Sequence, residues 1–232
     1  MFEFLFKNSL YITHCIEFIA AVIGVFYIRK HQGTAAVFFI IILVYLFFVD
    51  IIGTYYNNFL FFTTNKESVF YLNYWWFTIF FDIIAVILFV ILYQKILKNE
   101  RHKLILKYGA SIYFVIATVL ILYNTETLFK SSFPTLYILG AILIICCSGF
   151  YFIQILKDEN LLTFSRSLYF YISTAIFLWW LIITPLVFYD MYYILEDKSF
   201  ILLKRGIYIF SNMFMYLTFA IGLIVSKPEV KA

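Results

Sequence analysis

His14 and Glu17 are two titratable residues inside an otherwise apolar stretch, YITHCIEFIAAVIGVFY, which begins at Tyr11. A separation of three residues places both side chains on one face of a helix. An imidazole and a carboxylate held together can pair with each other or bind a cation. Ala21 and Gly24 continue this face, and small residues let helices approach closely in a membrane. We therefore expect the face to point into a helix bundle, because a charge exposed to hydrocarbon is costly.

Further acidic side chains are expected at a similar depth. At about 1.5 Å per residue of helix, Glu17 lies about 12 Å, Asp82 about 10 Å and Asp50 about 7 Å below the outer ends of their helices. Two polar residues of the last apolar run reach a similar level, and the sixth run has an aspartate near its outer end. The candidate ligand- or cation-binding residues are therefore His14, Glu17, Asp50, Asp82, Asp190, Ser211 and Asn212.

These acids have no fixed cationic partner apart from His14, because no lysine or arginine falls at their depth in any expected span. Burial can keep the carboxyl groups protonated, or the acids can bind a cation or an amine-bearing ligand. The alternative is structural: His14 pairs with Glu17, and nearby hydroxyl and amide groups satisfy the aspartates. The sequence leaves these alternatives open.

A metal site is a weaker hypothesis at this stage. One histidine with carboxylates suits zinc, manganese or iron, and a His and a Glu three residues apart on a helix can bind one ion. The other histidines, His31 and His102, fall in expected loops, so an intramembrane metal-dependent hydrolase ranks low and the role of a metal stays unknown. We expect a protein that is not an enzyme and has no cofactor.

Membrane-spanning helices are the elements that must position these residues. Hydrophobic residues make up 65% of the chain and charged residues 13%, far from the composition of soluble domains. Apolar runs long enough to cross about 30 Å of hydrocarbon recur along the sequence. They predict an all-α, seven-helix bundle that forms a single integral membrane domain over residues 1–232, with spans near 9–28, 35–55, 75–95, 104–123, 135–156, 168–189 and 206–226.

The positive charges predict the orientation of this bundle. Eleven of the 17 lysines and arginines fall on one side of the predicted spans, and short loops rich in these residues stay in the cytoplasm. The N-terminus is therefore expected outside and the C-terminus inside, which makes the polar pocket face outward. The net charge of +4 reflects this asymmetry and gives no support for nucleic-acid binding.

Several segments resemble a group of seven-span proteins common in the Bacteroidota. They are IEFIAAVIGVFYIRK, FVDIIGTYYNN, FYLNYWWFTIFFDIIAVILFVILYQKIL, SLYFYISTAIFL and GIYIFSNMFMYLTFAIGLI. Glu17 and Asp82 match the acidic positions of the first and third spans in that group. Some of its members occur beside, or fused to, histidine kinases. The resemblance implies a bacterial inner-membrane location and a sensory role.

The leading functional hypothesis is an inner-membrane receptor or sensor with an outward-facing polar pocket. The sequence contains no kinase, cyclase or DNA-binding part, so a signal would pass to a separate membrane protein partner or through a homo-oligomer. A small solute or proton-coupled transporter that uses the same acids is the first alternative. A structural subunit of a larger membrane complex is the second. The lipid bilayer is an expected partner, and the pocket is expected to take a small cationic or amine ligand.

Overall fold

A computed structural model describes residues 8–55, 68–157, 166–190 and 198–227 of the chain. Within these ranges the regular structure is entirely helical, which confirms the predicted fold class. Seven helical stretches in the described part are long and apolar enough to cross a membrane, as expected for a multi-pass membrane protein. They are α2 (Ser9–Tyr27), α3 (Ala35–Thr54), the α5–η2–α6 span (Tyr74–Ile96), α7 (Glu100–Tyr123), α9 (Pro134–Leu156), α10 (Leu168–Asp190) and α11 (Lys198–Val225).

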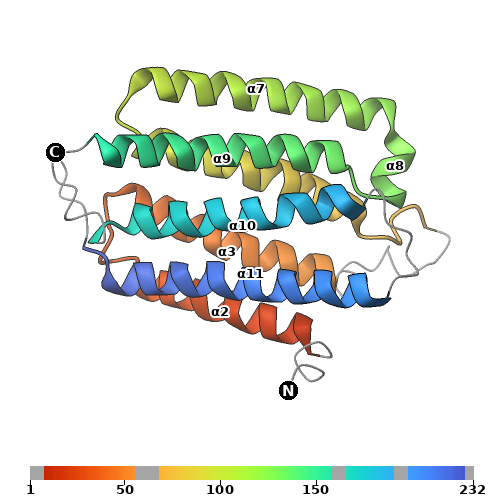
Figure 1. The fold of residues 1–232 in the computed structure, drawn as a ribbon, viewed down its shortest axis with the longest axis horizontal. Helices are drawn as coiled ribbons and strands as arrows, with labels where there is room; N and C mark the ends of the chain where they lie inside the picture. The colour runs from red at the N-terminus through yellow and green to blue at the C-terminus, as the bar shows by residue number, and fades with distance from the viewer. Residues whose placement is uncertain (1–7, 56–67, 158–165, 191–197, 228–232) are drawn as a thin grey trace.

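The long helices pack side by side in a flat bundle (Figure 1). One row runs in the order α7, α9, α10, α11 and α2, with each helix in contact with the next. Helix α3 packs against α2, and the α5–η2–α6 span joins α3 to α7 and α9 on the other side of this row. Helices α2 and α7 therefore lie at opposite edges of the bundle, and a short helix, α8 (Thr125–Lys130), follows α7.

Helices α7 and α11 begin earlier than the sequence predicts. Helix α7 begins at Glu100 rather than near residue 104, and α11 begins at Lys198 rather than near residue 206. Hydropathy misses these first turns because they contain charged residues. Lys204 lies inside α11, with its ammonium group 6.0 Å from the centre of the Tyr208 ring. A long lysine side chain at a helix end can reach the membrane surface, so this charge is compatible with a spanning helix.

The third span is irregular in the middle. It begins as α5 (Tyr74–Trp76), continues as a π-helix, η2 (Phe77–Ala85), and ends as α6 (Val86–Ile96). Tyrosine hydroxyls from neighbouring helices donate hydrogen bonds to its backbone: Tyr45 to the carbonyl oxygen of Phe80 at 2.7 Å, and Tyr113 to that of Asp82 at 2.5 Å. Backbone groups that leave regular helical bonding in a membrane need such partners. These two tyrosines therefore stabilise the wide turns.

One end of the bundle is tied together by Lys30, in the connection between α2 and α3. Its ammonium group donates hydrogen bonds to the carbonyl oxygens of Leu223 and Ile224, at 3.2 and 2.8 Å. These carbonyls belong to the last turn of α11, where a cation also interacts favourably with the helix dipole. We call this the Lys30 end of the bundle and the opposite end, where α3 finishes, the Asp50 end. Which end faces the cytoplasm stays a prediction.

Candidate functional site

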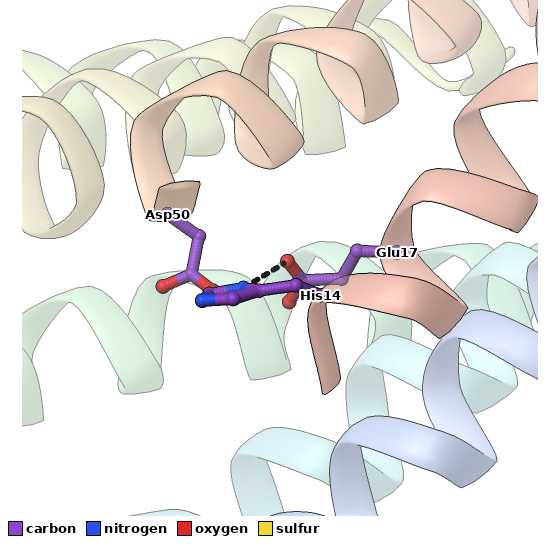
Figure 2. A group of neighbouring side chains, drawn as sticks. All are labelled: His14, Glu17 and Asp50. Atoms are coloured by element: carbon purple, nitrogen blue, oxygen red, sulfur yellow. Dashed lines mark ion pairs between the residues drawn. The ribbon is translucent and has the colours of Figure 1, made fainter. Parts of the chain in front are cut away.

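Three candidate residues come together between α2 and α3. His14 and Glu17 lie on α2, and Asp50 lies about one turn before the end of α3. The Nδ1 atom of His14 is 3.0 Å from Oδ2 of Asp50 and 3.7 Å from Oε2 of Glu17. Figure 2 shows the three side chains pointing toward one another from the two helices. One ligand atom from each residue lies within 4.8 Å of the others. We call these residues the acidic–histidine cluster.

The cluster is largely buried but opens at Asp50. His14 is 7% exposed and Glu17 is 3% exposed, whereas the Asp50 side chain is 29% exposed. Within the described part of the chain, neither ring nitrogen of His14 makes a hydrogen bond of acceptable direction, and neither does Oε2 of Glu17. The short distances are thus ion-pair contacts without directed hydrogen bonds. Buried polar atoms without a hydrogen bond are uncommon, and they often belong to a functional group or contact a ligand.

Aromatic residues surround the cluster. The Tyr55 ring lies 5.7 Å from the His14 ring, and the hydroxyl group of Tyr216, on α11, interacts with Glu17. Tyr216 is a contact that sequence reasoning missed. The sequence instead predicts two other residues of the same helix at this place, Ser211 and Asn212. The sequence feature that could identify Tyr216 is its spacing from Asn212, because a residue four positions further along lies on the same face of α11.

The position of Asp50 is fixed from the third span. The indole nitrogen of Trp76 donates a hydrogen bond to the carbonyl oxygen of Val49 at 2.9 Å, and the Asn73 amide donates one to the carbonyl oxygen of Gly53 at 2.9 Å. Gly53 permits this contact, because a Cβ atom there would lie 2.7 Å from the rings of Trp76 and Phe77. The backbone at the end of α3 is therefore tied to the third span on both sides of Asp50, and this sets the place from which the Asp50 side chain projects.

The other candidate residues lie elsewhere. Asp82 is buried on η2 and is absent from the group of ligand atoms that the described residues form around His14. Ser211 is buried, and Asn212 accepts a hydrogen bond from the Trp179 indole at 2.6 Å. The side chain of Asp190 lies outside the part that the structure describes. Residue counts give the depth of a side chain along a helix but not its direction around the helix axis, and the π-helix changes the residue spacing per turn at Asp82.

The geometry limits what the site can do. Within the described residues, no lysine or arginine forms an ion pair with Glu17 or Asp50, and the ion pairs of this cluster involve His14 alone. Two carboxylates and one imidazole offer electron pairs to a cation or a proton. Comparison with known proteins adds no guidance, because no family model, no curated protein and no solved structure shows significant similarity to the chain. The Bacteroidota resemblance therefore stays a prediction.

Proposed function

We propose that the protein is a receptor of the bacterial inner membrane in which the acidic–histidine cluster binds a small cation. The observation that carries this proposal is the bridge that the cluster makes between α2 and α3, through the 3.0 Å contact of His14 with Asp50. A cation that binds all three residues would draw the two helices together. An equilibrium between two packings of α2 would then respond to the cation, because a ligand shifts such an equilibrium by its difference in affinity for the two states.

The surroundings of the cluster favour a receptor over a transporter. Toward the Lys30 end, the buried residues of α2 that follow Glu17 are Ala20, Ala21 and Gly24. A Cβ atom added to Gly24 would lie 3.3 Å from the Ile40 side chain, so the two helices are packed closely there. No polar side chain among the described residues continues the cluster along this interface. A cation that enters at Asp50 therefore meets a closed apolar contact instead of a pathway.

In this proposal the signal passes from α2 to a second protein or to a second copy of this chain. The residues that the structure describes form helices and short connections. The functional change would be a movement of α2, which lies at the edge of the bundle. Helix α2 lies at this edge with much of its surface exposed, including Phe18 and Phe26, which are 52% and 78% exposed. A neighbouring membrane helix could therefore contact it directly. Coupling of this kind needs two states that the partner distinguishes.

The test uses purified full-length protein in lipid nanodiscs. Zn²⁺, Mn²⁺, Ca²⁺, K⁺ and ethylammonium would be added separately while thermal stability and tryptophan fluorescence are measured. We expect at least one cation to raise the melting temperature and change the fluorescence, because a ligand that binds the folded state stabilises it. His14→Gln should lose both responses, and Asp82→Asn, which alters a buried acid outside the cluster, should keep them.

Two results would decide against this function. If none of the five cations changes either signal, the cluster is a structural ion pair and the receptor proposal is wrong. If a cation accumulates inside proteoliposomes that contain wild-type protein, and His14→Gln abolishes the accumulation, the transporter hypothesis replaces it. Binding without accumulation supports the receptor.

A further inference from the structure

We propose that the acidic–histidine cluster is a binding site for a divalent first-row transition-metal ion, with His14, Glu17 and Asp50 as its protein ligands. This inference rests on the proposed function and names the class of cation that the receptor binds. It starts from the mutual distances of the three side chains and from the condition of the buried imidazole.

The distances suit a metal better than an ammonium group. Two donors bound to zinc at about 2.0–2.1 Å, at a tetrahedral angle, lie about 3.3–3.4 Å apart. The distances from His14 Nδ1 to the Asp50 and Glu17 oxygens, 3.0 and 3.7 Å, lie on either side of this value. Acceptors arranged tetrahedrally at about 2.8 Å around an ammonium nitrogen would lie about 4.6 Å apart. The two donor pairs that include His14 Nδ1 are closer together than this, which favours a metal ion over an ammonium group at the centre.

The imidazole provides an independent observation. The His14 side chain is only 7% exposed, and both of its ring nitrogens lack a hydrogen bond to any described residue. An imidazole without directed hydrogen bonds costs free energy in a membrane interior. Its nitrogen lone pair is, however, the donor that transition-metal ions prefer. Coordination would satisfy the ring nitrogen and one oxygen of Glu17 at the same time.

Charge and access also fit a divalent ion. Two ionised carboxylates and a neutral histidine carry a charge of −2, which a divalent cation neutralises without burying a net charge. Three protein ligands leave at least one coordination position for water, and the partly exposed Asp50 side chain lies on the open side. The nitrogen ligand disfavours Mg²⁺ and Ca²⁺, because these hard cations bind oxygen ligands.

The test uses Co²⁺ as a spectroscopic substitute for the metal. Wild-type protein in nanodiscs should bind one Co²⁺ per chain, with visible absorption bands whose intensity reports low coordination number. Zn²⁺ should displace it. His14→Gln, Glu17→Gln and Asp50→Asn should each weaken Co²⁺ binding by at least about 10–100-fold, because this is the loss that follows removal of a hydrogen-bonding partner of a metal ligand elsewhere. Asp82→Asn and His102→Gln are the matched controls, and both should bind Co²⁺ like the wild type.

A second measurement uses only wild-type protein, so it tests the metal site even if a variant fails to fold. Pulsed electron paramagnetic resonance of Cu²⁺-loaded protein should show one coordinated imidazole nitrogen. Three results would overturn the metal site. They are a Cu²⁺ spectrum without a signal from a coordinated imidazole nitrogen, Co²⁺ binding that does not saturate, and equal Co²⁺ binding by wild type and His14→Gln. If ethylammonium or K⁺ alone gives the stability and fluorescence responses, the cation receptor stands and the metal inference fails. If Co²⁺ binds at the cluster but none of the five cations changes the melting temperature or the fluorescence, the metal site stands and the receptor fails.

Discussion

The indole nitrogen of Trp76 donates a hydrogen bond to the carbonyl oxygen of Val49, and this bond joins the third span to the turn of α3 that carries Asp50. Its neighbour Trp75 differs in one respect: the Nε1 atom of Trp75 is buried and has no hydrogen-bond partner within the described residues. The two adjacent tryptophans thus provide a test of a single hydrogen bond. Both lose a similar volume when they are replaced by phenylalanine.

We expect Trp76→Phe to lower the free energy of unfolding by about 1 kcal/mol more than Trp75→Phe does, because only the first removes a hydrogen bond. Trp76→Phe should also weaken Co²⁺ binding, since Asp50 would be less well positioned. Thermal unfolding in one detergent and Co²⁺ titration would measure the two effects. Equal melting temperatures for the two variants would show that the bond to Val49 contributes little.

A second prediction concerns the contact between α10 and α11. A Cβ atom at Gly222 would lie 2.7 Å from Cβ of Tyr171, whereas a Cβ atom at Gly149 meets nothing within 4 Å. We expect Gly222→Ala to destabilise the protein by about 1–3 kcal/mol, because the helices must move apart. Gly149→Ala should be neutral or stabilising by up to about 1 kcal/mol, since alanine favours a helix over glycine. The melting temperatures of the two variants measure the difference, and a loss of similar size in both would contradict it.

The sequence predicts the helices well because their signal is local. Apolar runs of sufficient length identify all seven spans, and most of the helix ends in the structure lie close to the predicted ones. The exceptions, such as the start of α11 at Lys198, contain charged residues that hydropathy excludes. The spacing of His14 and Glu17 places them on a common face of α2, which the structure shows as well.

The partners of that face depend on tertiary packing, and the sequence carries little information about it. Residue counts place Asp50 and Asp82 at similar depths, yet only Asp50 meets His14. Residue counts do not give the rotation of a helix about its axis, and Asp82 lies in a π-helix, whose residue spacing the sequence does not reveal. The contact of Tyr216 with Glu17 likewise depends on how α11 packs on α2. A pattern within one helix cannot supply these relationships.

The orientation of the bundle gives a third prediction. By the spans that the sequence predicts, eleven of the 17 lysines and arginines fall on the same side as Lys30, and such an excess is typical of the cytoplasmic side. A fluorescent protein fused after Ala232 should therefore be fluorescent, and an alkaline phosphatase fused at the same position should be inactive. Paired fusions of a fluorescent protein and an alkaline phosphatase would measure this. A translocated reporter would place the acidic–histidine cluster on the cytoplasmic side and make its ligand an intracellular cation.

A pH dependence is expected at the Lys30 end, where His31 lies in the connection between α2 and α3. This residue is almost completely buried, and its Nε2 atom has no hydrogen-bond partner within the described residues. Burial lowers the pKa of His31 below its ordinary value of 6.5; a hydrogen bond with the Leu223 backbone opposes this shift in part, and the nearby Lys30 ammonium adds to it. The folded protein therefore holds His31 neutral where the unfolded chain binds a proton.

The sign of the effect follows from this difference. Above pH 6.5 the unfolded and folded states both hold His31 neutral, and the protein keeps its full stability. As the pH falls below 6.5, proton uptake favours the unfolded chain, so stability decreases. We expect the melting temperature in detergent to fall between pH 7 and pH 5, and His31→Gln to show a smaller fall than the wild type. His102→Gln, which replaces a ring that stacks on Phe150 at 4.4 Å, is the control for the substitution of a histidine by glutamine. An equal slope in wild type and His31→Gln would assign the pH dependence to other groups.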